Sequence, residues 1–368
     1  MPPTAPAPRR LVVKLGTGTL TTGIGKLDTA RLDRLAGDIA ALRQRGIEVI
    51  VVSSGAVGLG MGQLGIQRRP TRLSALQKCA AVGQSILIET WRKAFAPSGL
   101  QVAQLLLTRE DVRSRNRHVA LKSLFDELLA EGIVPVVNEN DSVSAEEIKF
   151  GDNDVLSALV AILTRSDLLV ILSTIPGLLD LKGDGELIPV VETIDDRIVA
   201  LAGGTTSATA VGGMASKIEA ARIATRSGCG LFIGSGSEAG LLSALLDGTA
   251  PGTFFVPSKL PMQSRKRWIA FFQPPQGIIH IDAGAERALR SEGRSLLAKG
   301  VVKAEGQFEA GDAVALAGPD GKPFARGLSR FSRETVDQLR GKTTEEIRRL
   351  QPELNHTEII HRDALVIH

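Results

Sequence analysis

Hydrophobic residues in the first two thirds of the chain gather in short apolar runs that alternate with longer stretches of helical period. The runs have strand length and cover 11–13, 47–52, 102–107, 133–137, 168–172 and 231–233. Between them, apolar residues recur at helical spacing over 28–45, 73–95, 119–131, 155–163 and 215–226. This alternation predicts parallel strands joined by right-handed crossovers. The expected fold class is therefore α/β, a sandwich with a mostly parallel central sheet.

The pattern changes after Pro257, where four prolines fall within nineteen residues. Residues 277–282 alternate apolar and polar positions, 301–303 and 312–316 resemble short strands, and 318–321 has the composition of a hairpin turn. We therefore expect a second, small β-rich domain. The predicted organisation is a disordered start at 1–8, a first domain at 9–257, a linker at 258–276 and a second domain at 277–368.

Charge changes this picture little. A chain of 368 residues agrees with two domains, and its net charge of +4 lies wholly in the last third, where 18 Lys and Arg face 14 Asp and Glu from Lys259 onward. An excess there hints at an anionic partner such as RNA. A solvated surface explains four charges equally well.

Cysteine and histidine usage bounds the compartment and the chemistry. Two cysteines, Cys79 and Cys229, cannot build a disulfide framework, so we expect a cytoplasmic protein with buried free thiols. The five histidines are scattered, and no protein metal site is expected. The Pro/Ala-rich start lacks the apolar core of a signal peptide, and no run of 18 apolar residues predicts a membrane span.

Polar residues cluster where the run 133–137 ends. Asn138, Asn140 and Asp141 form one cluster, and the sequence Asp152-Asn153-Asp154 forms another. The carboxyl end of a buried parallel strand is where α/β proteins place their sites. A stretch rich in Asn and Asp is also typical of a solvated turn. Two clusters flanking residues 147–150, which could form one arm of a hairpin, favour a site.

Two other strands end in glycine-rich turns. Lys14 and Gly16 follow the first strand, and such a turn with a lysine is a plausible phosphate cradle. An ordinary turn with an exposed lysine is the alternative. Ser54 and Gly55 begin a stretch with five glycines. Such a stretch is typical of a closely packed helix, of a mobile loop, or of a backbone that approaches a ligand closely.

A third segment rich in small residues, 203–214, opens the helix 215–226. Lys217 falls in the first turn of a helix, where its charge opposes the helix dipole. A ligand anion at that helix start would justify the lysine, and a tolerated surface lysine is the alternative.

Taken together, these motifs resemble the amino acid kinase family, and among its branches the kinases of glutamate. The residues that carry the resemblance are Val13-Lys14-Leu15-Gly16-Thr17, Ser54-Gly55-Ala56, Val137-Asn138-Glu139-Asn140-Asp141, Gly151-Asp152-Asn153-Asp154 and Gly212-Gly213-Met214-Ala215-Ser216-Lys217. The tail resembles a PUA domain through Asp282-Ala283-Gly284-Ala285, Gly293-Arg294-Ser295-Leu296-Leu297, Gly311-Asp312-Ala313-Val314 and Ala325-Arg326-Gly327-Leu328.

The resemblance implies transfer of the γ-phosphoryl group of ATP, accompanied by Mg²⁺, to the side-chain carboxylate of L-glutamate in proline synthesis. It implies catalytic roles for Lys14, Lys217 and Asp154. The residues implied to bind glutamate are Ser54, Asn138, Asp141, Asp152 and Asn153. The residues implied to bind ATP are Lys14, Gly16, Gly55, Ser173, Thr174, Val211, Gly212, Gly213, Met214, Ala215, Ser216 and Lys217.

Two positions depart from the family pattern. Ser173-Thr174 stands where Thr-Asp is frequent, and Val211 where Thr is frequent, which puts those nucleotide contacts in doubt. The resemblance also suggests a homo-oligomer, a dimer or tetramer, and feedback inhibition by proline.

The sequence leaves two other functions open. Sister kinases act on aspartate, acetylglutamate, carbamate or a nucleoside monophosphate, but the paired Asn/Asp clusters and the tail argue against them. RNA binding by the tail ranks well below the kinase, because the tail has few aromatic residues and a small charge.

Overall fold

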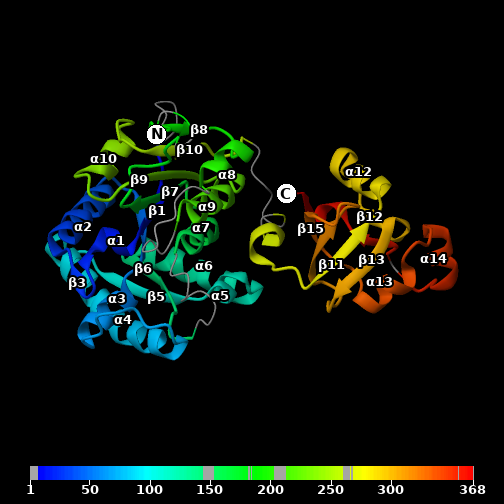
Figure 1. Ribbon diagram of the computed structural model, residues 1–368, viewed down its shortest axis with the longest axis horizontal. Helices are drawn as coiled ribbons and strands as arrows, with labels where there is room; N and C mark the ends of the chain where they lie inside the picture. The colour runs from blue at the N-terminus through cyan, green and yellow to red at the C-terminus, as the bar shows by residue number, and fades with distance from the viewer. Residues whose placement is uncertain are drawn as a thin grey trace. The chain divides into compact units, whose positions relative to one another are not determined.

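The structure is a computed structural model that describes residues 7–143, 153–180, 183, 185–202, 213–259, 266, 268–354 and 356–367. For residues 109, 113, 115, 116, 268 and 272 it describes the backbone alone. The chain forms two compact units, Met1–Pro261 and Met262–His368 (Figure 1). The predicted hairpin at 147–150 lies outside the described residues.

The first unit is built on an eight-stranded sheet in the order β5-β6-β4-β1-β7-β9-β10-β8. Neighbouring strands are parallel except at the β9–β10 pair, so the sheet is mostly parallel, as predicted. Its strands are β1 (Arg10–Leu15), β4 (Glu48–Ser53), β5 (Val102–Leu107), β6 (Val134–Glu139), β7 (Leu168–Ser173), β8 (Val190–Val191), β9 (Gly230–Ser235) and β10 (Thr253–Phe255). A separate ribbon pairs β2 (Thr21–Gly23) with β3 (Lys26–Leu27).

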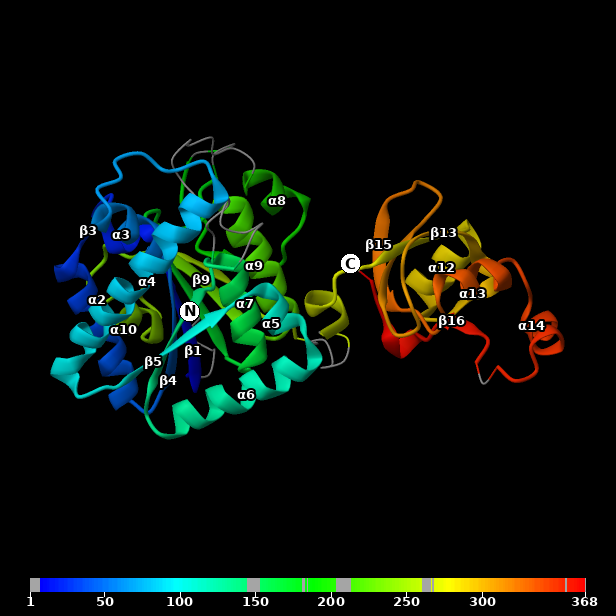
Figure 2. The ribbon, with the colours of Figure 1, turned by 90° about the horizontal axis from the view of Figure 1, so that it is seen from below.

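Helices cover both faces of this sheet and make a three-layer sandwich (Figure 2). Helices α2, α4 and α10 lie on one face, and α6, α7 and α9 lie on the other. The helices are α1 (Thr17–Leu20), α2 (Thr29–Gln44), α3 (Ala56–Gln63), α4 (Leu73–Phe95), α5 (Arg109–Arg113), α6 (Arg115–Ala130), α7 (Asp154–Leu163), α8 (Asp196–Ala202), α9 (Met214–Arg226) and α10 (Leu241–Leu246). Short 3-10 turns such as η1 (Ala96–Ser98) connect some of them.

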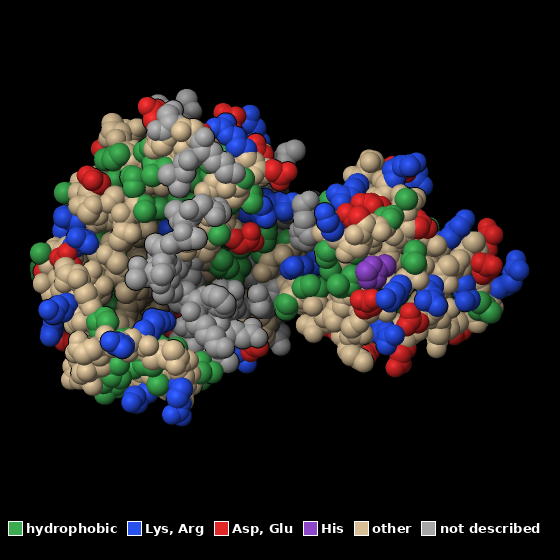
Figure 3. All heavy atoms as spheres, in the orientation of Figure 1, with side chains coloured by type: hydrophobic (Ala, Val, Ile, Leu, Met, Phe, Trp, Pro, Cys, Tyr) green, Lys and Arg blue, Asp and Glu red, His purple; other side chains and the backbone are tan. Residues whose placement is uncertain are grey.

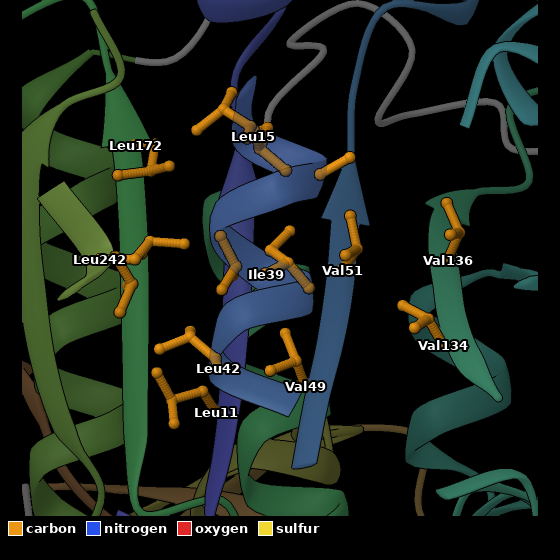
Figure 4. Packing of buried hydrophobic residues seen from close by; sticks show 14 of the residues in the cluster. Leu11, Leu15, Ile39, Leu42, Val49, Val51, Val134, Val136, Leu172 and Leu242 are labelled. Atoms are coloured by element: carbon orange, nitrogen blue, oxygen red, sulfur yellow. The ribbon is translucent and has the colours of Figure 1, made fainter. Parts of the chain in front are cut away.

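The core explains why the helices lie where they do. Leu35, Ile39 and Leu42 of α2 are buried against the strands, beside Val49 and Val51 of β4 (Figure 4). Each fully buried side chain of this size contributes about 1.5–3 kcal/mol of transfer free energy. The apolar stripe read from the sequence over 28–45 is therefore the stripe that packs the helix.

Most elements of the first unit agree with those predicted. Asp28 caps α2, because its carboxylate accepts the N–H of Arg31 at 3.0 Å. Helix α6 begins at Arg115, four residues before the predicted start. Helices α8 and α10 and strands β8 and β10, which are short, were not predicted, because a segment of two to seven residues shows too little periodicity.

The glycine-rich stretch after Ser54 forms a helix, α3, rather than a loop. A Cβ atom on Gly60 would lie 1.8 Å from the carbonyl oxygen of Cys79, and one on Gly83 would lie 1.8 Å from that of Ala56. Glycine at these two positions lets α3 and α4 pack backbone against backbone. Close helix packing is therefore the reason for Gly60, whereas Gly55 has a positive φ of 115° and begins the helix.

The second unit has a five-stranded sheet in the order β13-β11-β14-β15-β17 and a two-stranded pair, β12 with β16. Its strands are β11 (Gly277–Ile281), β12 (Leu296–Leu297), β13 (Val301–Gly306), β14 (Ala313–Ala317), β15 (Pro323–Leu328), β16 (Glu358–Ile360) and β17 (Leu365–Ile367). Its helices are η3 (Trp268–Phe272), α12 (Ala283–Glu292), η4 (Ala298–Gly300), α13 (Arg333–Leu339), α14 (Thr344–Leu350) and η5 (Arg362–Ala364). The predicted turn at 318–321 joins the antiparallel strands β14 and β15.

The segment before this sheet packs onto it. Ile269 and Ala270 are buried with Ala364 and Val366. Arg326 donates hydrogen bonds to the carbonyl oxygens of Ala270 and Gln273. The predicted domain boundaries, with a linker over 258–276, stay a prediction. Over the described ranges, no helix is both long and apolar enough to cross a membrane.

Candidate active site

The site is built at the carboxyl edge of four neighbouring parallel strands. Strands β6, β4, β1 and β7 lie side by side in the sheet, and parallel pairing brings their carboxyl ends to one edge. Lys14, Ser53, Asn138 and Ser173 stand at or near those ends. Four segments that are far apart in the chain therefore present polar side chains at one place.

Three helices also begin at this edge. Gly55, Asn153 and Gly213 are the residues before α3, α7 and α9, and none of them caps its helix through a side chain. Free N–H groups at a helix start favour an anion. By contrast, Asp28 caps α2 with its carboxylate. The edge thus offers backbone donors as well as side chains.

Three charged side chains meet between β1, α7 and α9. Lys14 Nζ lies 2.5 Å from Asp154 Oδ1, and Lys217 Nζ lies 2.9 Å from Asp154 Oδ2. The hydroxyl of Ser216 donates to Asp154 Oδ2 at 3.0 Å. Asp154 is fully buried, and both lysines are at least 94 % buried by side chain. The alternative interpretation of Lys14 and of Lys217 as exposed surface lysines is therefore wrong.

Electrostatics keeps this carboxylate ionised. Burial by itself raises the pKa of Asp154, because an ionised carboxylate loses its water. The ammonium groups of Lys14 and Lys217 outweigh that effect, so the pKa of Asp154 lies below its usual range. One carboxylate therefore holds two ammonium groups at fixed positions beside each other.

A second, neutral network begins one residue earlier in the chain. Asn153 Nδ2 lies 3.2 Å from the backbone oxygen of Ser53, 3.0 Å from Ser54 Oγ and 2.8 Å from Asn138 Oδ1, so its two hydrogens are shared among three acceptors. Asn153, Ser54 and Asn138 are each buried. Asn153 therefore contacts two others of the five residues predicted to bind glutamate.

Helix α4 supplies a residue that the sequence did not reveal. Asn138 Nδ2 donates to Gln84 Oε1 at 2.7 Å. The signal was present in the sequence, because Gln84 interrupts an apolar stripe formed by Ala80, Leu87 and Trp91 at helical spacing. A polar residue inside a core-facing stripe needs a polar partner.

The remaining residues predicted to bind ATP or glutamate differ in their exposure and contacts, and some lie outside the described residues. Gly16 donates its N–H to the carbonyl of Leu172 at 3.3 Å, so that N–H is used within the sheet. Thr174 is exposed and lies against Gly18, where an added Cβ atom would be 2.9 Å from its methyl group. Met214 is buried, Ala215 and Gly213 are exposed, and Asp141 is half-buried, two residues after the end of β6. Asp152, Val211 and Gly212 lie outside the described residues.

Comparison with known proteins gives a consistent result. Residues 9–235 match the model of the amino acid kinase family, and residues 277–350 match that of the PUA domain. Glutamate 5-kinase from Caldanaerobacter subterraneus subsp. tengcongensis is 44% identical over 97% of this chain and 97% of its own. Glutamate 5-kinase from Moorella thermoacetica is 44% identical over 98% of this chain and 96% of its own.

The chain was also compared with solved structures. A carbamate kinase from Giardia lamblia bound to AMP-PNP has a TM-score of 0.48 and 20% identity, and it covers 68% of this chain and 99% of its own. That likeness is too small to carry an argument. The family matches and the high identity over almost the full length decide the assignment: this chain belongs to the amino acid kinase family and, within it, to the glutamate 5-kinases, with a PUA domain at its C-terminal end.

Proposed function

We propose that the protein transfers the γ-phosphoryl group of ATP to the side-chain carboxylate of L-glutamate, giving L-glutamyl 5-phosphate and ADP in the first step of proline biosynthesis. The observation that carries the proposal is the pairing of both Lys14 and Lys217 with Asp154, directly beside the network around Asn153. Family membership and the relatives' names support the same reaction.

The lysines supply charge where the reaction needs it. Phosphoryl transfer asks little covalent help from a protein, so catalysis consists of positioning and of stabilising charge on the equatorial oxygens. Lys14 and Lys217 come from different elements and converge on one carboxylate. In the proposed mechanism they flank the transferred group, and Asp154 keeps their ammonium groups from turning away.

No general base is required. The attacking oxygen belongs to the side-chain carboxylate of glutamate, which is already ionised at pH 7. That oxygen forms the new bond to phosphorus while the bond to the β,γ-bridging oxygen breaks, and ADP leaves with the electron pair. Asp154 has both oxygens engaged with lysines and Ser216, so it is a positioning carboxylate and not a proton acceptor.

The neutral network suits an amino acid. Ser54 keeps a hydroxyl hydrogen after accepting from Asn153, and Asn138 keeps one amide hydrogen after donating to Gln84. Such donors are complementary to a carboxylate. Asp141 and Asp152 are proposed to receive the ammonium group of glutamate.

The nucleotide is proposed to lie against the starts of α3 and α9 and the ends of β1 and β7. Lys14, Gly16, Gly55, Ser173, Thr174 and residues 211–217 form that proposed set. Both oxygens of Asp154 are engaged with lysines, so this carboxylate is not available as a metal ligand. The residues present therefore fit a Mg²⁺ ion that is held mainly through the phosphates of ATP, and such an ion would neutralise the negative charge of those phosphates.

A coupled assay of ADP release tests the proposal. Purified protein should release ADP in the presence of ATP and Mg²⁺ with glutamate, and much less with aspartate or acetylglutamate. Equal rates with and without glutamate would reject the proposed function. Faster turnover of another acceptor would move the chain to a sister activity.

Repeating the glutamate assay with added proline tests the proposed feedback, and sedimentation of the same sample tests the proposed homo-oligomer.

RNA binding by the second unit receives little support. Basic and acidic side chains are interspersed on the face that Figure 3 shows, and many pair with each other, such as Arg290 with Glu286 and Arg330 with Glu358. A nucleic-acid site usually gathers basic residues on one face. Affinity for RNA that falls steeply from low to moderate salt would revive this alternative.

A further inference from the structure

Gln84 lies at the end of a hydrogen-bond chain whose direction is determined by the backbone. The carbonyl oxygen of Ser53 can only accept, so the Asn153 atom facing it must be Nδ2. Asn153 Nδ2 also faces one end of the Asn138 amide, which must therefore be Oδ1. The other end, Asn138 Nδ2, then donates to Gln84, which must present Oε1. Each amide orientation follows from the one before it.

The hydrogen-bond chain depends on Gln84, its last acceptor. Asn138 is 2 % exposed, so water cannot readily replace a lost partner of its Nδ2 group. An apolar side chain in place of Gln84 would leave that N–H group without this acceptor. Asn138 could then turn about its terminal bond and present Nδ2 to the Nδ2 of Asn153, which places two donors against each other.

Helix α4 holds Gln84 in a fixed place. The neighbouring residue, Gly83, lies against the backbone of α3 so closely that a Cβ atom would be 1.8 Å from Ala56 O. Seven residues later on the same helical face, Trp91 Nε1 donates to Ser53 Oγ at 2.9 Å. Ser53 and Asn138 follow the paired residues Val52 and Val137 at the ends of adjacent strands. One helix therefore contacts the ends of both β4 and β6 through hydrogen bonds.

We propose that Gln84 is a positioning residue for the amino acid substrate: by accepting from Asn138, it holds Asn138, and with it Asn153 and Ser54, in the orientation that binds glutamate. This inference rests on the proposed function, because it assigns the network around Asn153 to glutamate. Gln84 acts through Asn138 and does not need to touch the substrate.

The test replaces the amide by an apolar group of similar size, in Gln84→Met. The matched control is Gln77→Met, at a half-buried glutamine on the same helix whose side chain makes no hydrogen bond within the described part of the chain. We expect the KM for glutamate to rise roughly five- to tenfold in Gln84→Met, the scale of one hydrogen bond. The KM for ATP should stay close to the parent value in both variants, and the melting temperature of Gln84→Met should fall by no more than a few degrees, roughly the cost of one unsatisfied buried donor.

A double-mutant cycle adds a readout that a merely structural role would not give. If Gln84 acts through Asn138, adding Gln84→Met to Asn138→Ala should change kcat/KM for glutamate by less than about twofold. A further five- to tenfold loss in the double variant would show that Gln84 acts by another route and would overturn the proposal.

Two other results would also overturn it. One is a parent-like KM for glutamate in Gln84→Met. The other is an equal rise of both KM values together with a lower melting temperature, which would mean a disturbed fold. The proposed function is tested separately, on the parent protein: it is rejected if that protein shows no glutamate-dependent release of ADP.

Discussion

On one side of the peptide bond between Asn153 and Asp154 lies a network of neutral groups, and on the other lies a cluster of charges. Asn153 donates to Asn138 and Ser54, whereas Asp154 holds Lys14 and Lys217. Both sets are buried at the same sheet edge. The start of one helix therefore carries two kinds of contact, one between neutral groups and one between charges.

The difference between the two sets teaches where each should act in the reaction. Fixed charges stabilise charge that changes as phosphorus moves between oxygens, so the lysine cluster should affect kcat. Neutral hydrogen bonds to an amino acid are made before and during the reaction alike, so the amide network should affect KM. Substitutions in the two sets should therefore change kcat and KM separately.

Asp154→Asn should have the largest effect. It leaves two buried ammonium groups without their carboxylate, and breaking a buried ion pair in this way costs about 3–5 kcal/mol of unfolding free energy. Turnover should be lost as well. The control is Asp126→Asn, since Asp126 also pairs with two basic groups, Arg10 and Lys122, but its side chain is 39% exposed. We expect about 1 kcal/mol or less there. Denaturant titration measures both, and equal losses would contradict the assignment.

Lys217→Ala should lower kcat by about 10²–10³-fold, the usual effect of removing one group that stabilises the transition state. The fold should persist, because Asp154 keeps its contact with Lys14. Arg222→Ala, on the same helix with an exposed side chain, should leave kcat near that of the parent. A normal kcat in Lys217→Ala would remove this lysine from the mechanism.

Gly83→Ala tests the close contact between α3 and α4, the helix that carries Gln84. The added Cβ atom would meet Ala56 O and Gly60 N, so we expect a loss of about 1–3 kcal/mol in unfolding free energy. Gly37→Ala is the matched control, since Gly37 is exposed within α2 and a Cβ atom there meets nothing within 4 Å. That change should stabilise the protein by up to about 1 kcal/mol. Similar melting curves for both variants would show that the two helices can separate without cost.

Asn153→Ala should raise the KM for glutamate by roughly tenfold and lower kcat less, because it removes donors that contact Ser54 and Asn138. The same direction is expected for Asp152→Asn. Steady-state kinetics in glutamate and in ATP distinguish the outcomes. A collapse of kcat at constant KM would place the neutral network in the chemical step and erase the contrast with Asp154.

The smallest expected effect is a change in how the unfolding free energy depends on pH in the acid range. The pKa of Asp154 is lowered in the folded protein, so its contribution to stability is present above the unfolded pKa of about 4 and is lost as pH falls below that value. Unfolding free energy measured from pH 6 to pH 3 should therefore fall less steeply in Asp154→Asn than in the parent. Parallel pH profiles would indicate that Asp154 is not stabilised by the two lysines.

The sequence by itself determined the layers of the first unit and the motifs of the site. Apolar runs and helical stripes repeat locally, and burial of those stripes decides where strands and helices form, as α2 and α4 show. The glycine pattern was ambiguous, because a glycine tolerates both a left-handed turn, as at Gly55, and close helix contact, as at Gly60. Local spacing cannot distinguish the two.

Only the tertiary structure decided which polar residues meet. Lys14 and Lys217 lie 140 and 63 residues from Asp154 in the sequence, and parallel strands with crossovers bring both ammonium groups within 3 Å of its carboxylate. Gln84 has no motif around it, and only the fold reveals its hydrogen bond with Asn138, which lies 54 residues away in the sequence. Hydrophobic burial is largely a local pattern, whereas a hydrogen bond depends on distance and direction that the whole fold must supply.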